Sequence, residues 1–114
     1  MEINKDELRI WIAALRSGEY QQGNGTLQSK NGYCCLGVAC KVLIPAKSLK
    51  FLDDKLAGNY PEDQPKSPKW LRHIDLDVKT KFGIQLSELN DAGNWSFNQI
   101  ADLLEKLYLT DGNQ

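Results

Sequence analysis

Apolar residues recur at helical spacing near the start of the chain, in its middle and near its end. In the first of these stretches, Leu8, Trp11 and Leu15 fall on one face when the chain is wound at about 3.6 residues per turn. Polar residues that can cap a helix precede them, and Gly18 follows, a residue type that ends helices in the left-handed conformation. We therefore predict a helix over residues 5–17.

The second stretch, at about 35–43, carries Lys41 as its only charge and is apolar nearly all round, which is typical of a buried helix. The third begins at Ser96, which is suited to cap a helix, and Gln99 completes a capping box. We expect the helix at 35–43 to pack against the first helix and the last one. These apolar faces predict a core of Trp11, Leu15, Leu36, Cys40, Leu43, Phe97, Ile100 and Leu104.

A β-hairpin is predicted between the first two helices. Residues 26–28 and 33–34 flank a turn that contains Asn31 and Gly32, and Asn-Gly is a strong hairpin signal because both residues tolerate positive φ. A two-stranded ribbon is marginally stable alone, so we expect it to pack on the central helix.

The segment 44–69 has the least regular pattern. Its apolar residues predict a short amphipathic helix, followed over residues 58–68 by a loop with three prolines that is long enough to be a lid or a binding loop. Beyond this irregular, proline-rich loop at about 57–69, the chain returns to the core, forms a short helix that ends at Gly83, and makes one more turn. The apolar residues of the predicted helix are Leu49, Phe51, Leu52 and Leu56, and those after the loop are Trp70, Leu71, Ile74, Val78, Phe82, Ile84, Leu86 and Leu89.

Together these elements predict an α+β fold: a small, mostly helical domain with one short hairpin packed on a central buried helix. A chain of 114 residues is the usual size of one domain with a modest core, so residues 1–114 are assigned to a single globular domain.

Charge and hydropathy exclude several classes of function. The net charge of −1 gives no basic excess for direct nucleic-acid binding, and Asp75 and Asp77 interrupt the one basic cluster, which favours a solvated face. No apolar run approaches the roughly 18 residues of a membrane span. The N-terminus has no signal-peptide pattern, and three cysteines fit a reducing compartment, so we expect a cytoplasmic protein. The basic cluster comprises Lys66, Lys69, Arg72, Lys79 and Lys81.

The cysteines raise the question of catalysis. Cys35 would begin the central helix, where the helix dipole lowers a thiol pKa, and His73 is the one histidine that could act as its base. The Cys-Leu-Gly-Val pattern there loosely resembles the nucleophile helix of papain-like amidases. No third orienting residue is evident, and buried thiols that act as small hydrophobes are commoner. We expect no catalysis and no cofactor, and the spacing of cysteines and histidine predicts no metal site.

A polar, glycine-rich segment after the first helix is the candidate binding site. It offers aromatic faces, neutral amides and backbone N–H groups, which together suit a small nucleotide-like ligand. The alternative is a plain structured turn that joins the first helix to the hairpin. The candidate ligand-binding residues are Arg16, Tyr20, Gln22, Gly23, Asn24, Gly25, Lys30 and Tyr33.

The motif Leu15-Arg16-Ser17-Gly18-x-Tyr20-x-Gln22-Gly23-x-Gly25-x-Leu27, followed by Tyr33-Cys34-Cys35-Leu36-Gly37-Val38-x-Cys40, resembles small tailed-bacteriophage proteins of unassigned function. Leu89-Asn90-Asp91, Ser96-Phe97 and Ile100-Ala101-Asp102 are similar to the C-terminal signature of that family, while residues 44–68 stay unmatched. The resemblance implies an accessory protein in the infected bacterial cell. By association with other small phage proteins, it implies an anti-defence role in which a host nucleotide signal is sequestered.

Two other functions stay open at this point. A protein-binding module that inhibits or redirects a host factor would use the loop at 58–68 and an exposed Trp70 as its anchor. A cysteine-dependent amidase or peptidase would use Cys35 and His73. We also predict a homodimer whose interface involves residues 20–33, because the hairpin has strand edges that a second copy could cover.

Overall fold

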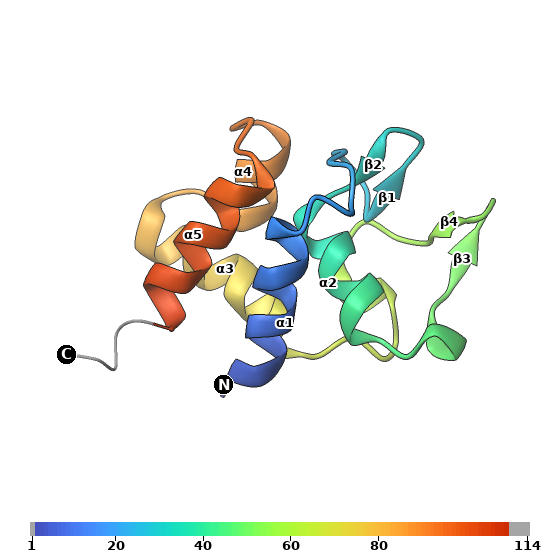
Figure 1. Ribbon diagram of the computed structural model, residues 1–114, viewed down its shortest axis with the longest axis horizontal. Coiled ribbons are helices and arrows are strands. Elements are labelled where there is room, and N and C mark those ends of the chain that lie inside the picture. The colour runs from blue at the N-terminus through green and yellow to red at the C-terminus, as the bar shows by residue number, and fades with distance from the viewer. Residues whose placement is uncertain (1, 110–114) are drawn as a thin grey trace.

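Five α-helices and two small β-hairpins make up the computed structural model, which describes residues 2–109 (Figure 1). The first, central and last helices lie where the apolar periodicity predicts them. Asn4 caps the first helix through its side chain, and Ser96 and Gln99 form the capping box of the last one. The helices are α1 (Lys5–Arg16), α2 (Cys35–Leu43), α3 (Trp70–Phe82), α4 (Leu86–Asp91) and α5 (Phe97–Tyr108).

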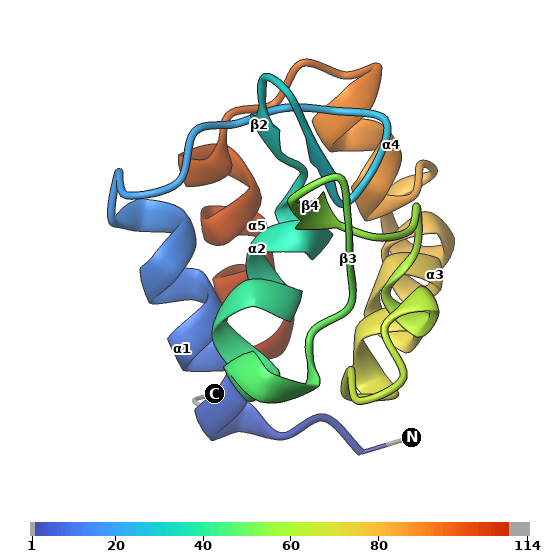
Figure 2. The ribbon, with the colours of Figure 1, turned by 90° about the vertical axis from the view of Figure 1, so that its right-hand side faces the viewer.

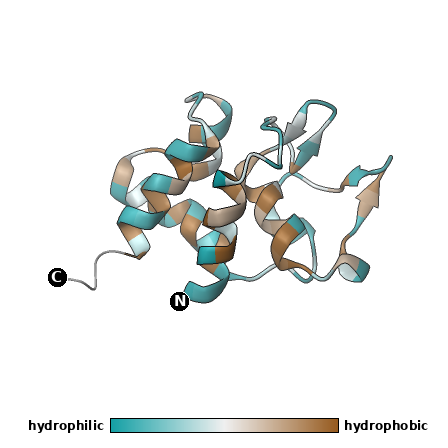
Figure 3. Cartoon of the chain, viewed as in Figure 1, coloured by the Kyte–Doolittle hydropathy of each residue, from teal (hydrophilic) through white to brown (hydrophobic). Residues whose placement is uncertain are grey.

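The central helix α2 is the most deeply buried element. Residues 35–40 are all buried, and α1 packs against both α2 and α5 (Figures 1 and 2). The predicted packing of α2 on α1 is confirmed, but it is α1 and not α2 that packs extensively against α5. The ribbon of α2 is coloured hydrophobic along most of its length (Figure 3). The indole Nε1 of Trp11 donates a hydrogen bond of 2.9 Å to the carbonyl oxygen of Cys35, which ties α1 to the start of α2. The predicted core is confirmed except at Leu43, which is only partly buried.

Gly37 lets the backbone before the first hairpin lie directly on α2. A Cβ atom at this position would lie 1.8 Å from the carbonyl oxygen of Leu27, so no larger residue fits without a backbone shift. The hairpin itself is confirmed as β1 (Gln28–Ser29) paired antiparallel with β2 (Gly32–Tyr33). Gly32 pairs with Ser29 instead of lying in the turn, so the turn is shorter than predicted and both strands are shifted toward it.

The predicted helix around Leu49 to Leu56 is wrong: this segment forms a second antiparallel hairpin of β3 (Phe51–Leu52) and β4 (Lys55–Leu56). The turn consists of Asp53 and Asp54, with φ of 52° and 66°, the left-handed values that a two-residue hairpin turn requires. Aspartate tolerates this conformation better than most residues, because its side chain can bond locally to the backbone.

The predicted loop at 58–68 is irregular, as expected, but it contains a short 3-10 helix at Pro61–Asp63 and two buried residues, Pro61 and Gln64. After it, α3 runs without a break to Gly83, whose φ of 92° ends the helix in the left-handed conformation as predicted. The short helix predicted before Gly83 is therefore the second half of α3.

Trp70 is not an exposed anchor, and that prediction is wrong. Its side chain is 5% exposed and lies with its ring centroid 6.1 Å from that of Trp11. Its Nε1 donates a hydrogen bond of 3.1 Å to Glu7. The indole ring is therefore packed in the core while its N–H group has a hydrogen-bond partner. The chain is thus a mostly helical α+β domain, as predicted, with a second hairpin that the sequence pattern did not reveal. Among the described residues, no helix is long and apolar enough to cross a bilayer.

Candidate functional site

The glycine-rich segment after α1 runs alongside the first hairpin as a third, strand-like partner. Gln22 forms a parallel bridge to Tyr33: the Gly23 amide donates to the Tyr33 carbonyl at 2.7 Å, and the Tyr33 amide donates to the Gln21 carbonyl at 2.8 Å. The approach is close, because a Cβ atom on Gly32 would lie 2.2 Å from the Gln21 carbonyl oxygen. Glycine at position 32 is therefore a packing requirement of this site.

A network of carboxamides holds this segment to the end of α4. The Nε2 of Gln22 donates to Asn90 Oδ1 at 2.8 Å and to the carbonyl oxygen of Trp95 at 2.7 Å. Asn90 is 4% exposed, and its Nδ2 donates to the Gly23 carbonyl oxygen and to Asp91 Oδ1, each at 2.9 Å. Buried polar groups that are satisfied in this way fix one geometry, so the segment is well ordered although it lacks regular structure.

Asp91 extends the network to the second glycine of the segment, since its Oδ1 also accepts from the Gly25 amide at 3.1 Å. Two residues of the Leu89-Asn90-Asp91 motif thus hold the candidate loop. The stretch Gln22 to Gly25 and the motif at 89–91 are far apart in the sequence and form one structural unit.

A hollow of about 280 Å³ opens over this network, and most of its lining is neutral carboxamide. The side chains of Asn24, Asn31 and Asn94 are exposed and make no hydrogen bond within the described residues, so each offers a free donor and a free acceptor. We call this site the amide hollow. Its lining residues are Gln22, Gly23, Asn24, Asn31, Asn90, Asn94 and Trp95.

Trp95 supplies the aromatic surface of the amide hollow. Its side chain is partly buried and meets the ring of Phe82 edge to face, with centroids 5.5 Å apart and planes at 82°. This contact orients the indole before any ligand arrives. No lysine, arginine or histidine lines the hollow within the described residues, so it presents neutral hydrogen-bonding groups beside one aromatic ring.

The structure divides the predicted ligand-binding residues between different places. Gln22, Gly23 and Asn24 line the amide hollow, whereas Arg16 and Tyr20 line a separate hollow of about 230 Å³ that also includes Gln22. The Arg16 guanidinium forms ion pairs with Asp102 at 2.7 Å and with Glu105 at 2.9 Å. These hydrogen bonds raise the pKa of Arg16 and hold its side chain against α5.

The remaining predicted residues do not line the amide hollow. Tyr20 and Tyr33 meet edge to face with centroids 5.4 Å apart. The pKa of Tyr33 is raised mainly by burial and to a smaller extent by the electrostatic effect of Tyr20. Gly25 is held by Asp91, and Lys30 is exposed in the turn between β1 and β2.

Asn31, Asn90, Asn94 and Trp95 were not predicted as site residues. Asn31 lies in the Asn-Gly turn of the first hairpin, and the signal for the other three was the turn-rich, amide-rich run at 90–94 placed just before an aromatic residue and a helix N-cap. Such a run normally indicates only a loop. Its contribution to the hollow depends on the fold, which brings it against the segment that contains Gln22.

The thiols do not have the environment of a nucleophile, and the predicted lowering of the Cys35 pKa is wrong. Cys35 is fully buried, and burial raises its pKa well above the usual range. Burial likewise raises the pKa of Cys34 to about 11, although its Sγ accepts from the Gly37 amide as the N-cap of α2. Burial raises the pKa of Cys40 to about 12. His73, on α3, makes no hydrogen bond to Cys35, both being described residues.

The chain belongs to a protein family described as a domain of unknown function (DUF8296), whose match covers residues 3–108. The match includes every element of the fold and all residues of the amide hollow. No curated protein and no solved structure matches the chain.

Proposed function

We propose that the protein is a non-catalytic binding protein that takes up a small nucleotide-type molecule in the amide hollow and sequesters it. The observation that carries this proposal is the set of free carboxamides of Asn24, Asn31 and Asn94 beside the oriented ring of Trp95. The edge of a nucleobase carries both donors and acceptors, which carboxamides match, and its flat face stacks on aromatic rings. The volume of about 280 Å³ suits a base with its ribose better than a whole dinucleotide.

No cationic group lines the hollow among the described residues, so we expect the uncharged part of the ligand to enter it. Phosphates are usually bound by arginine, lysine or a helix N-terminus, so they would stay outside. Lys30 adjoins Asn31 in the hairpin turn and is exposed, so it would be the cation available to one phosphate. The base and the sugar would therefore supply specificity, with a modest charge contribution.

The biological setting that we infer is the cytoplasm of a phage-infected bacterium, where the ligand would be a nucleotide signal of host defence. The support for this setting is the resemblance of the motifs at 15–40 and 89–102 to small phage proteins. Those motifs include Gln22, Gly23 and Asn90, which hold the amide hollow together, whereas Asn24, Asn31, Asn94 and Trp95 lie outside the motif positions. The resemblance therefore supports the framework of the site and not the groups that would contact the ligand.

The predicted homodimer remains a prediction, but the argument from free strand edges no longer supports it. Gln22 covers the outer side of β2, and the Leu56 amide, on β4, donates to the Gln28 side chain of β1 at 2.8 Å. Residues from the same chain therefore contact both strands of the hairpin. Light scattering at micromolar concentration distinguishes a mass near 13 kDa, expected of a monomer, from twice that value.

Calorimetry with nucleosides, cyclic dinucleotides and ADP-ribose derivatives tests the proposed function. Trp95 provides a second readout: Trp11 and Trp70 are 0% and 5% exposed, so a ligand in the hollow should change mainly the Trp95 fluorescence. Asn24→Ala and Asn94→Gly should each weaken binding about tenfold or more, since each removes a side chain that bonds the ligand. Glycine is chosen at position 94 because φ there is 55° and alanine would be strained.

Asn59→Ala is the matched control, because Asn59 is also exposed but lies outside the amide hollow. The Asn59→Ala variant should bind the ligand with the same affinity as the unchanged protein. Failure of every compound in the panel to bind folded protein would rule the proposal out, and so would equal affinity in the Asn24 and Asn94 variants.

A further inference from the structure

The proline-bearing segment and the first turn of α3 form a second concave site, which we call the proline groove. Its volume is about 380 Å³, at the lower end for ligand pockets. The apolar walls are Pro61, Pro65 and Pro68, and the charged lining residues are Glu62, Lys69 and Arg72. The groove shares no lining residue with the amide hollow.

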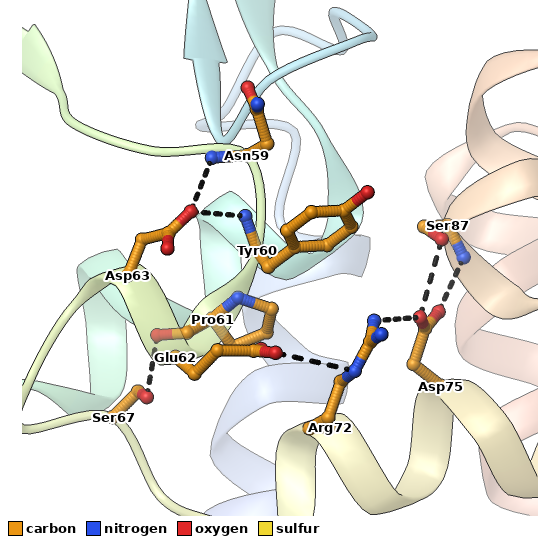
Figure 4. Close-up of polar contacts among 9 residues, drawn as sticks. All are labelled: Asn59, Tyr60, Pro61, Glu62, Asp63, Ser67, Arg72, Asp75 and Ser87. Carbon is orange, nitrogen blue, oxygen red and sulfur yellow. Dashed lines mark hydrogen bonds and ion pairs between the residues drawn. The ribbon is translucent and has the colours of Figure 1, made fainter.

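The walls of the proline groove are preformed. Each proline has a fixed φ, and Ser67 Oγ donates to the Pro61 carbonyl at 2.7 Å across the segment (Figure 4). The carboxylate of Asp63 accepts from the amides of Asn59 at 2.9 Å and Tyr60 at 3.1 Å, which closes the turn. A ligand therefore has little chain to order when it binds, which favours affinity.

Arg72 is held on three sides while one end of its guanidinium stays free. Nη1 donates to the buried Asp75 at 3.3 Å, Nε lies 3.4 Å from Glu62, and the ring of Tyr60 stacks 5.0 Å from Cζ (Figure 4). Asp75 is fixed in turn by the Ser87 amide at 2.8 Å. Nη2 has no partner among the described residues, so it can donate to a ligand.

Lys69 adds a second cation at the same end of the groove. It is exposed, forms no ion pair with any described residue, and precedes the first turn of a 13-residue helix. The positive end of the helix dipole adds to its charge. With Glu62 as the single acid, the lining carries a net positive charge beside apolar walls.

We propose that the proline groove binds an extended peptide segment of a partner protein in which a carboxylate follows an apolar side chain. The apolar side chain lies against the proline rings, and the carboxylate accepts from Arg72 Nη2 and Lys69 Nζ. Tyr60 remains 47% exposed although it covers Arg72, so apolar surface continues past the groove. A peptide is long enough to cover this surface as well as the groove, whereas a small carboxylate in the groove would leave the surface exposed to solvent.

The test is a chemical-shift titration of the ¹⁵N-labelled full chain with the peptide N-acetyl-Leu-Leu-Glu amide and its Gln counterpart. The Glu peptide should shift the amide signals of Ser67, Lys69 and Arg72, and the Gln peptide should bind about tenfold more weakly because it lacks the charge. Added salt should weaken binding of the Glu peptide more than binding of the Gln peptide.

Lys69→Ala should reduce affinity for the Glu peptide severalfold without affecting folding, because the Lys69 side chain holds no other residue. Lys79→Ala, an exposed lysine of the last turn of α3, is the matched control and should bind normally. Equal affinity for the two peptides, shifts at Asn24 and Asn94 in place of the groove, or no shift at all would each overturn the proposal. Groove signals that move with protein concentration alone would assign the groove to a second copy instead.

Discussion

The helical body and the segment 44–69 are stabilised by different interactions. In the body, Trp11, Leu36 and Ile100 are wholly buried, and packing of apolar side chains holds the helices together. In the middle segment, Leu49 and Leu56 belong to the core at 8% and 3% exposed, but Phe51 and Leu52 are 51% and 69% exposed, so β3 contributes little to it. These few apolar anchors are supplemented by polar side chains that bond to the backbone of neighbouring turns.

Gln64 shows how the middle segment is held. Its side chain is 1% exposed; Oε1 accepts from the Lys50 amide at 2.8 Å, and Nε2 donates to the carbonyl oxygens of Lys50 at 2.8 Å and Ala57 at 3.0 Å. Those backbone groups belong to the two ends of the second hairpin. One buried carboxamide thus joins the hairpin to the proline-bearing segment, a task that apolar contacts perform in the helical body.

The largest effect is expected from a cavity in the body. Leu36→Ala should lower the free energy of unfolding by about 2–5 kcal/mol, because it removes buried methyl groups and leaves a void. Leu52→Ala is the same change at an exposed site of β3 and should cost less than about 0.5 kcal/mol. Chemical denaturation measures both. A cost below 1 kcal/mol for Leu36→Ala would show that α2 is not central to the core.

Gln64→Leu tests whether polar bonds replace apolar packing in the middle segment. The apolar side chain keeps a similar size but leaves the Lys50 amide and the Ala57 carbonyl without this partner, and the Lys50 carbonyl keeps only its bond from the Ala57 amide. We therefore expect a loss of about 1–3 kcal/mol. Hydrogen exchange should quicken at Lys50 and Ala57 before it quickens in α2. Gln21→Leu, at an exposed glutamine with no side-chain bond, is the control. Equal exchange rates in both variants would contradict this account.

Two aspartates on α3 provide a test with opposite signs. Burial raises the pKa of Asp75 above 3.8, whereas the hydrogen bonds from Tyr108 and Lys81 lower the pKa of Asp77 below that value. A carboxyl whose pKa is raised on folding loses stabilising free energy as pH rises through its folded pKa. One whose pKa is lowered loses it as pH falls through its folded pKa.

The free energy of unfolding, measured against pH, should therefore respond differently to the two substitutions. Relative to Asp75→Asn, the unchanged protein should become less stable as pH rises above 3.8. Relative to Asp77→Asn, it should become less stable as pH falls below 3.8. All other titrating groups are common to each pair, so the differences isolate the two carboxyls. Difference curves that are flat, or that slope the other way, would reject the assigned environments.

These contrasts explain how much of the fold could be predicted. Helix α1 was predictable because its buried residues Leu8, Trp11 and Leu15 are three and four positions apart, a spacing that fits a helix and not a strand. The second hairpin was not, because Leu49 to Leu56 also fit a helical stripe. Only the Asp53-Asp54 turn distinguishes the two structures, and paired aspartates are a weaker hairpin signal than Asn-Gly.

The candidate site divides in the same way. Gln22, Gly23 and Asn24 were predicted from their local composition, which glycine and amide residues make conspicuous. Asn90 and Trp95 complete the amide hollow from a distant part of the chain, and contacts between distant segments leave no periodicity to detect. The burial that raises the Cys35 pKa was likewise a property of tertiary packing, whereas its place at a helix start was local.

The smallest effect is expected at the turn of the second hairpin, where strain can be relieved without touching the body. Asp54 has a φ of 66°, a conformation that glycine adopts at no steric cost, so Asp54→Gly should stabilise the hairpin by about 0.5 kcal/mol. Asp54→Ala should destabilise it by about 1 kcal/mol, since alanine cannot bond locally to offset the strain. The Ala57 amide, which donates to the Lys50 carbonyl at 3.0 Å, reports hairpin opening through hydrogen exchange. Because Phe51 and Leu52 lie outside the core, exchange in α2 should stay the same in both variants. A matching change in α2 would mean that the hairpin and the body unfold as one unit.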